Sequence, residues 1–254
     1  MHPILFHIGD FPIYSYGVMF FLAFAAAILL VRYRLSKYGV EPSSIYLLAA
    51  LMAITGVIGA RIFYVIGHFS EYSSNWGRLF DMNTAGMVFY GGLLFCIPVG
   101  IIAVKRMKLP LGKLADAIGL ALPLSLAIAR VGCFLNGCCG GKPTDLPWAV
   151  TFPGAVSAVH PTQIYEIILD LSVFFTLLLI SKRLTKDGDL LLLSIAAYGV
   201  IRFTMEFFRA HSNPMAAPFF QALSAAIVVA VLGILLYRHG FRVLPFQRKA
   251  LSKQ

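Results

Sequence analysis

The chain has 254 residues, of which 59% are hydrophobic and only 13% are charged, and its mean hydropathy is +0.82. A soluble globular domain does not reach this balance, so the composition predicts an integral membrane protein. The formal net charge of +10 raises the possibility of a nucleic-acid partner, and the positions of the basic residues argue against one.

Seven apolar runs of about 20 residues follow one another along the chain, each long enough to cross a bilayer. Because unpaired peptide groups are costly in lipid, such runs are expected to be helices, and the alternating segments typical of a barrel are absent from the sequence. The predicted fold class is therefore an all-α, polytopic membrane bundle of seven transmembrane helices. In chain order the runs cover about 15–31, 44–69, 87–104, 114–134, 163–180, 190–208 and 219–237.

Basic residues mark one side of this predicted bundle. By the positive-inside rule that side is the cytoplasm, so the N-terminus is expected outside and the C-terminus inside. Residues 1–254 are expected to form a single membrane domain, with outer loops near 70–86 and 137–162. Fifteen of the 21 lysines and arginines follow the first, third, fifth and seventh runs: Arg32, Arg34, Lys37, Lys105, Arg106, Lys108, Lys113, Lys182, Arg183, Lys186, Arg238, Arg242, Arg248, Lys249 and Lys253.

Four other arginines lie inside or at the ends of apolar runs, where an ionisable group is expensive and usually functional. Arg130, Arg202 and Arg209 approach the outer ends of their runs, and Arg61 lies deeper in the second run. Guanidinium groups suit a phosphate because they bind it through two parallel hydrogen bonds. A bound phospholipid headgroup is the economical interpretation.

Carboxylates accompany these arginines in the same runs. Glu206 lies four residues after Arg202 and three before Arg209, a spacing that predicts one shared helix face. Glu166 and Asp170 lie one turn apart in the fifth run. Two interpretations stay open: ion pairs that only orient the helices, or a site that retains positive charge for an anionic ligand.

Polar motifs gather at the same predicted outer ends. Gly91 and Gly92 permit the close approach of either a lipid chain or a neighbouring helix. His160 is either a proton relay or a packing residue, and Tyr16 and Tyr90 are either site residues or members of an interfacial aromatic belt. The motifs are "IYSYG" (13–17), "GMVFYGGLL" (86–94) and "HPTQIYE" (160–166).

Together with "ARVGCFLNGCCGG" (129–141) and "YGVIRFTMEFFR" (198–209), these motifs resemble the prolipoprotein diacylglyceryl transferase family, in order and over almost the whole chain. The resemblance implies transfer of the diacylglyceryl group of phosphatidylglycerol to the lipobox cysteine thiol of a preprolipoprotein. A thioether forms and glycerol phosphate is released. It also implies a multi-pass protein of the bacterial cytoplasmic (inner) membrane, with the active site towards the outer leaflet, membrane lipid around it and no cofactor.

The resemblance also implies roles for individual residues. Arg202, which matches the family's essential arginine, and Arg130 are expected to stabilise the departing phosphate. Tyr90 or His160 is the expected general base or proton relay for the acceptor thiol, and Tyr90 stands where many members carry a histidine. Substrate binding is expected of a further set, in which Arg61 is included for its depth in the second run and the glycines for their small size: Tyr16, Arg61, Gly91, Gly92, Asn136, Glu206 and Arg209.

The signature departs from the usual family pattern at its cysteines. Cys133 stands where asparagine is usual, Cys138 stands where glutamate is usual, and Cys139 follows. These thiols are expected to pack tightly, to form a disulfide that includes Cys133, or to react beside Arg130 and receive the lipid transiently. The C-x4-C-C spacing matches no standard zinc pattern, so no metal is expected. Cys96 is expected to be an apolar filler.

Two rival functions stay open at the level of the sequence. One is a paralogous membrane transferase that moves a phospholipid-derived group to another acceptor. The other is a non-catalytic phospholipid-binding or redox membrane protein, with the arginines as headgroup anchors and the cysteines as a thiol switch.

Overall fold

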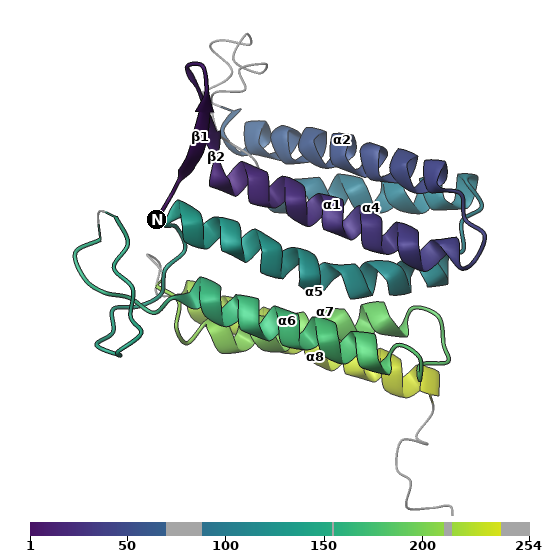
Figure 1. The fold of residues 1–254 in the computed structure, drawn as a ribbon. Helices are drawn as coiled ribbons and strands as arrows, with labels where there is room; N and C mark the ends of the chain where they lie inside the picture. Colours follow the sequence, from purple (N-terminus) through teal and green to yellow (C-terminus); the bar gives the residue numbers. More distant parts are fainter. Residues whose placement is uncertain (70–87, 154, 211–214, 240–254) are drawn as a thin grey trace, which may run out of the picture. The chain divides into compact units, whose positions relative to one another are not determined.

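The computed structural model describes residues 1–69, 88–153, 155–210 and 215–239 (Figure 1). The predicted outer loop near 70–86 therefore lies outside the described residues. The elements in chain order are β1 (Ile4–Ile8), β2 (Phe11–Tyr14), α1 (Ser15–Ser36), α2 (Pro42–Gly67), α4 (Phe89–Arg106), α5 (Leu111–Asn136), α6 (Thr162–Ile180), α7 (Asp189–Met205) and α8 (Ala216–His239).

Each of the seven apolar runs forms a helix, which confirms the predicted all-α class. Five of these helices, α1, α2, α5, α6 and α8, are long and apolar enough to cross a membrane. That α4 and α7 also cross, and that the N-terminus lies outside, stay predictions. Large apolar side chains point outward from the helices: Phe21 is 69% exposed, Leu179 77% and Val229 70%. Such exposure is unfavourable in water and is expected where the side chains contact lipid.

An antiparallel hairpin of β1 and β2 precedes α1 and was not predicted. Its signal in the sequence is the Gly9-Asp10 pair between apolar residues, because Gly9 adopts the positive φ of 60° that such a tight turn uses. The segment before the hairpin caps α1: the Ser15 amide donates to the Pro3 carbonyl over 2.9 Å, and the Ser15 hydroxyl donates to the same carbonyl over 2.8 Å.

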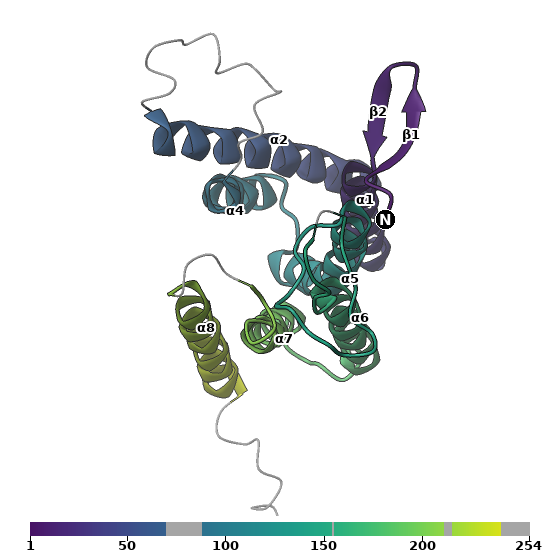
Figure 2. The same cartoon turned by 90° about the vertical axis from the view of Figure 1, so that its left-hand side faces the viewer.

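The described residues divide into two compact units, one formed by residues 1–31 and 115–254 and the other by residues 32–114. In the second unit α2 and α4 lie side by side (Figure 2). Their contact depends on small residues: a β-carbon at Gly91 would lie 2.4 Å from the Phe63 β-carbon and 2.7 Å from the Gly59 carbonyl oxygen. At Gly92 the nearest atom would be the Gly56 carbonyl oxygen at 3.1 Å. Both glycines therefore pack closely against α2, and a further role towards a lipid stays a prediction.

In the first unit, Leu120 of α5, Leu177 of α6 and Leu190 of α7 form a buried cluster. Polar contacts hold one end of these helices together. Asp189, 1% exposed at the start of α7, contacts Arg238 and His239 in the last turn of α8, and Asp116 of α5 accepts the Leu190 amide over 2.9 Å. This end of the first unit is rich in basic residues, and Arg130, His160 and Arg202 lie towards the other ends of their helices.

Gly91→Ala should destabilise the protein by about 1–3 kcal/mol, because the added methyl group overlaps atoms of α2 that have no room to move. Gly233→Ala is the matched control, since nothing lies within 4 Å of its β-carbon position in α8 and alanine favours a helix. Thermal unfolding in detergent compares the two variants. Equal melting temperatures would contradict the packing role of Gly91.

Candidate active site

A buried carboxylate joins two guanidinium groups at the end of the first unit that is opposite the basic residues. Glu166, in the first turns of α6, is 5% exposed. Its Oε2 contacts Nε of Arg130 near the end of α5, and its Oε1 lies 2.8 Å from Nη2 of Arg209 beyond α7. Three separate segments are therefore held together by one side chain.

Helix α7 ends three residues earlier than predicted, and this changes the partner of Arg209. The predicted shared face of Glu206 and Arg209 is wrong, because the chain turns after Met205 and Arg209 leaves the helix. Its backbone pairs with Gly141, and the neighbouring Phe208 carbonyl accepts the Lys142 amide over 2.8 Å. Arg209 therefore reaches Glu166 of α6 instead of Glu206.

Arg202 pairs with Glu206, as its i,i+4 spacing predicts. Nη2 of Arg202 lies 2.6 Å from Oε1 of Glu206, whose side chain is fully buried, and its guanidinium lies over the Phe220 ring of α8 at 5.2 Å. Among the described residues, Arg130 and Arg209 thus pair with Glu166, and Arg202 pairs with Glu206. These described pairs bring positive charge to the helix ends where an anionic ligand is expected.

The loop after α5 crosses this end of the helices and passes close to Arg209. A β-carbon at Gly141 would lie 2.5 Å from the Phe208 carbonyl oxygen and 2.8 Å from the His160 β-carbon, so only glycine fits at the crossing. The Gly141 amide donates to the His160 carbonyl over 2.9 Å, and Nζ of Lys142 donates to the Phe207 carbonyl over 2.9 Å. These bonds connect the loop to both α6 and the segment after α7.

His160 belongs to an aromatic cluster at the entry to α6. Its ring lies 5.2 Å from the Phe208 ring and 6.1 Å from the Tyr165 ring, and its Nδ1 is 3.3 Å from the Tyr165 hydroxyl. The same hydroxyl accepts the indole N–H of Trp148 over 2.7 Å. Packing is thus established for His160, and its part in proton transfer stays a prediction.

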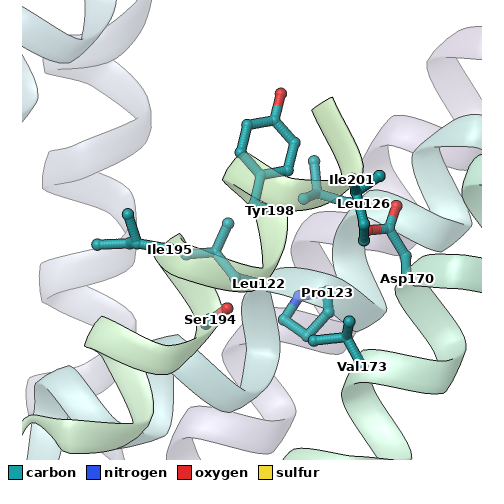
Figure 3. A pocket seen from close by; sticks show the side chains of 9 residues that line it. All are labelled: Leu122, Pro123, Leu126, Asp170, Val173, Ser194, Ile195, Tyr198 and Ile201. Atoms are coloured by element: carbon teal, nitrogen blue, oxygen red, sulfur yellow. The ribbon is translucent and has the colours of Figure 1, made fainter. Parts of the chain in front are cut away.

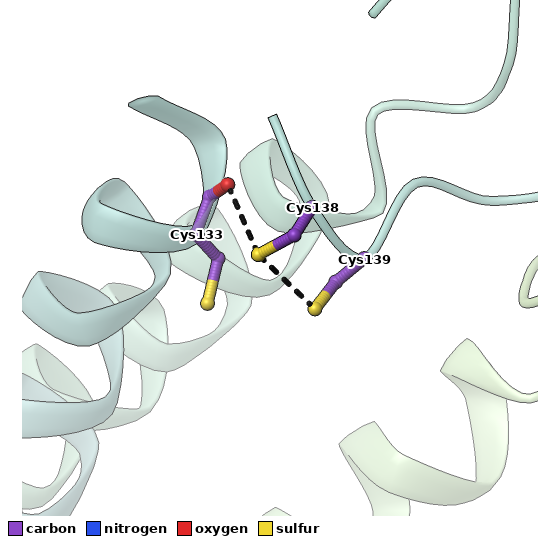
Figure 4. A group of neighbouring side chains, drawn as sticks. All are labelled: Cys133, Cys138 and Cys139. Atoms are coloured by element: carbon purple, nitrogen blue, oxygen red, sulfur yellow. Dashed lines mark hydrogen bonds between the residues drawn. The ribbon is translucent and has the colours of Figure 1, made fainter. Parts of the chain in front are cut away.

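Three thiols converge at the end of α5 (Figure 4). The sulfur atoms of Cys133, Cys138 and Cys139 all lie within 4.8 Å of one another, and those of Cys138 and Cys139 are 3.6 Å apart. Cys133 is buried and its sulfur lies 4.0 Å from Nη1 of Arg130. All three are free thiols. Cys96 is free as well and donates to the Met52 carbonyl over 3.1 Å, as an interior filler would.

Two buried side chains of α6 hold the backbone of the cysteine pair. The Thr162 hydroxyl donates to the Cys139 carbonyl over 2.7 Å, and the Gln163 amide donates to the Cys138 carbonyl over 2.5 Å. Each of the two donors is 1% exposed. Sequence reasoning missed this clamp, because side-chain to backbone bonds across 23 and 25 residues leave no local pattern.

The environment raises the pKa of both loop thiols. Burial raises the pKa of Cys138, and its hydrogen bond with Asn136 opposes that effect in part. The hydrogen bond to Cys133, followed by burial, raises the pKa of Cys139. Without a further ligand, both groups are therefore thiols at neutral pH.

The remaining predicted residues divide between the two units. Tyr16 lies at the start of α1 and is 46% exposed. It is close enough to Arg130 and to the three thiols to interact with their charges. Arg61, Tyr90, Gly91 and Gly92 belong to the second unit, where Arg61 lies over the Tyr64 ring at 5.8 Å and Tyr90 is 63% exposed. Their substrate-binding and catalytic roles stay predictions.

A small cavity of about 70 Å³ lies between α5, α6 and α7 (Figure 3). Its lining is apolar except at Ser194, Tyr198 and the buried carboxyl of Asp170, one turn beyond Glu166. This volume accommodates a few atoms and excludes an acyl chain. The cavity itself is therefore unsuited to a lipid substrate.

Comparison with known proteins identifies the family of the chain. The family described as prolipoprotein diacylglyceryl transferase matches residues 3–238. The chain belongs to this family. Proteins named phosphatidylglycerol–prolipoprotein diacylglyceryl transferase are 33% identical in Geobacter sulfurreducens, over 91% of this chain and 92% of the relative, and 31% identical in Clostridium tetani, over 93% and 97%. The protein of that name in Clostridioides difficile is 31% identical over 92% of each chain.

Replacing Glu166 by glutamine should destabilise the protein by about 3 kcal/mol, because two partly buried guanidinium groups lose their shared counter-charge. Glu41→Gln makes the same chemical change at an exposed site and should cost less than about 0.5 kcal/mol. Thermal unfolding of both variants in detergent measures the difference. Equal stability would show that Glu166 does not hold the three segments together.

Proposed function

We propose that this chain transfers the diacylglyceryl group of phosphatidylglycerol to the lipobox cysteine thiol of a preprolipoprotein, with release of glycerol phosphate. Family membership over almost the whole chain supports the reaction. The observation that carries the proposal is the ion-pair network in which Arg130 and Arg209 share Glu166 at the helix ends that also present Arg202. This network supports the proposal, because guanidinium groups bind a phosphate ester through parallel hydrogen bonds.

The reaction is a displacement at the saturated glycerol carbon that bears the phosphate. The acceptor sulfur forms a bond to that carbon, and the carbon–oxygen bond breaks with its electron pair moving to the phosphate. Negative charge therefore grows on the leaving group, and preorganised guanidinium groups stabilise it. Arg202 and Arg130 take this role. Arg209 has a buried Nε without a hydrogen-bond partner in the described structure and supports phosphate binding.

Substrate binding and proton transfer extend this assignment. Substrate binding is assigned to Tyr16, Asn136, Glu206 and Arg209 of the first unit and to Arg61, Gly91 and Gly92 of the second. Tyr90 or His160 removes the acceptor proton. The protein acts in the bacterial cytoplasmic membrane with seven spans, an outer N-terminus and its site towards the outer leaflet, because its basic residues follow alternate helices.

Replacing Arg202 by alanine should lower transfer to a lipobox peptide by about 10²–10³-fold, since a transition-state charge loses its donor. Lysine should restore only part of the activity, because an ammonium group lacks the planar fork of guanidinium. The assay uses membranes with phosphatidylglycerol labelled in its acyl chains. Arg183→Ala, at an exposed basic position, is the matched control and should keep full activity. Full activity of both Arg202 variants would contradict the phosphate role.

A second candidate function is a paralogous transferase with another acceptor, and the cysteines at positions 133 and 138 are the observation that favours it. Genetic complementation separates the two functions. The proposed enzyme should restore growth and lipoprotein modification to a strain depleted of its own diacylglyceryl transferase, and a paralog should not. A protein that binds phosphatidylglycerol without consuming it would instead be the non-catalytic alternative.

A further inference from the structure

We propose that Cys133, Cys138 and Cys139 bind a thiophilic divalent metal ion of the zinc class, whose open fourth position takes the acceptor thiol. The metal site stands on the geometry of the three sulfurs, and its role towards the acceptor rests on the function proposed above. Zinc bonds sulfur at about 2.3 Å, so tetrahedral ligands lie about 3.8 Å apart. The sulfurs here lie within 4.8 Å of one another, and the Cys138–Cys139 pair is at 3.6 Å.

The loop is shaped for this convergence by contacts other than those of the thiols. Thr162 and Gln163, both 1% exposed, fix the carbonyls of Cys139 and Cys138. Cys139 is held at φ 69°, a conformation that a residue with a β-carbon adopts only at a cost. The fixed backbone turns the Cys139 side chain towards Cys133 and Cys138. Such preorganisation is typical of a ligand site and is more than packing of small side chains requires.

The charge balance of the surroundings fits a three-thiolate site. Three thiolates and one divalent cation sum to one negative charge, and a neighbouring cation stabilises this charge where the site is partly buried, at Cys133. Arg130 is that cation, because its Nη1 lies 4.0 Å from the Cys133 sulfur while its Nε contacts Glu166. Arg130 is thus positioned between the thiol cluster and the carboxylate network.

A metal site with three protein ligands keeps one position open, and a thiol that occupies it is deprotonated at neutral pH. On coordination the acceptor thiol would lose its proton to the base assigned above, Tyr90 or His160. Its sulfur electron pair then forms the bond to the glycerol carbon, and the electron pair of the broken carbon–oxygen bond leaves with glycerol phosphate. No oxidant or reductant is consumed.

Metal binding is tested on the full chain in detergent micelles, reduced and then kept without oxygen. One Zn²⁺ per chain is expected by elemental analysis, and Co²⁺ should show sulfur-to-metal charge-transfer absorption. Cys138→Ser should weaken binding by at least about 100-fold, since losing even an outer-sphere partner costs 10–100-fold. Cys139→Ser should behave alike, and Cys96→Ser, outside the cluster, should bind as the wild type does. Absence of a metal in the reduced wild type, or binding unchanged in the cluster variants, would overturn the site.

The role towards the acceptor is tested by chelation. Metal-free protein should transfer the diacylglyceryl group to a lipobox peptide at least about tenfold more slowly, and added Zn²⁺ should restore the rate. Unchanged transfer by metal-free protein would overturn the inference and leave the proposed function in place. Stoichiometric Zn²⁺ binding with no transfer in any metal state would overturn the proposed function and the acceptor role together. A stable disulfide within the cluster after mild reduction would overturn the metal site itself.

Discussion

The arrangement of the site depends on one carboxylate. Glu166 lies between two guanidinium groups that come from the end of α5 and from the segment after α7, and it is itself nearly fully buried. Buried ion pairs gain little net stability over apolar packing, because both charges lose their hydration. What they do provide is geometry: with Glu166 in place, neither Arg130 nor Arg209 can turn away without leaving a charge uncompensated in a medium of low dielectric constant.

The first turns of α6 organise more than this network. Thr162 and Gln163 hold the cysteine loop by its carbonyls, and Glu166, one turn later, holds the arginines. A single rigid helix end thus sets the position of the thiols and of the charges at once. The placement of functional groups on one such element keeps their mutual distances constant, which a flexible loop alone does not achieve.

The sequence predicts the helices well and the site only in part. Hydrophobic length is a local property, so all seven helices appear near their predicted bounds. The hairpin at residues 4–14 was missed because only its turn has a clear sequence signal, and the end of α7 was misplaced by three residues because an apolar run continues through Phe208. The pairing of Arg209 with Glu166 spans 43 residues and follows from that turn. Periodicity within one helix therefore pointed to Glu206, the wrong partner for Arg209.

In the proposed reaction, the arginines serve the departure of the phosphate and the thiols serve the activation of the acceptor. Departure of the phosphate requires positive charge near the leaving oxygen. A thiol nucleophile must instead lose its proton, and a positive charge favours that loss only when it lies close to the sulfur. Arg130 contacts Glu166 through one nitrogen and approaches Cys133 through another. The family resemblance implies an amide and a carboxylate at the positions of Cys133 and Cys138, and both groups are weaker ligands for a soft metal than thiolate is. Under the proposed mechanism, sulfur at both positions beside Arg130 leaves the phosphate-binding arginines in place and changes how the acceptor thiol is activated.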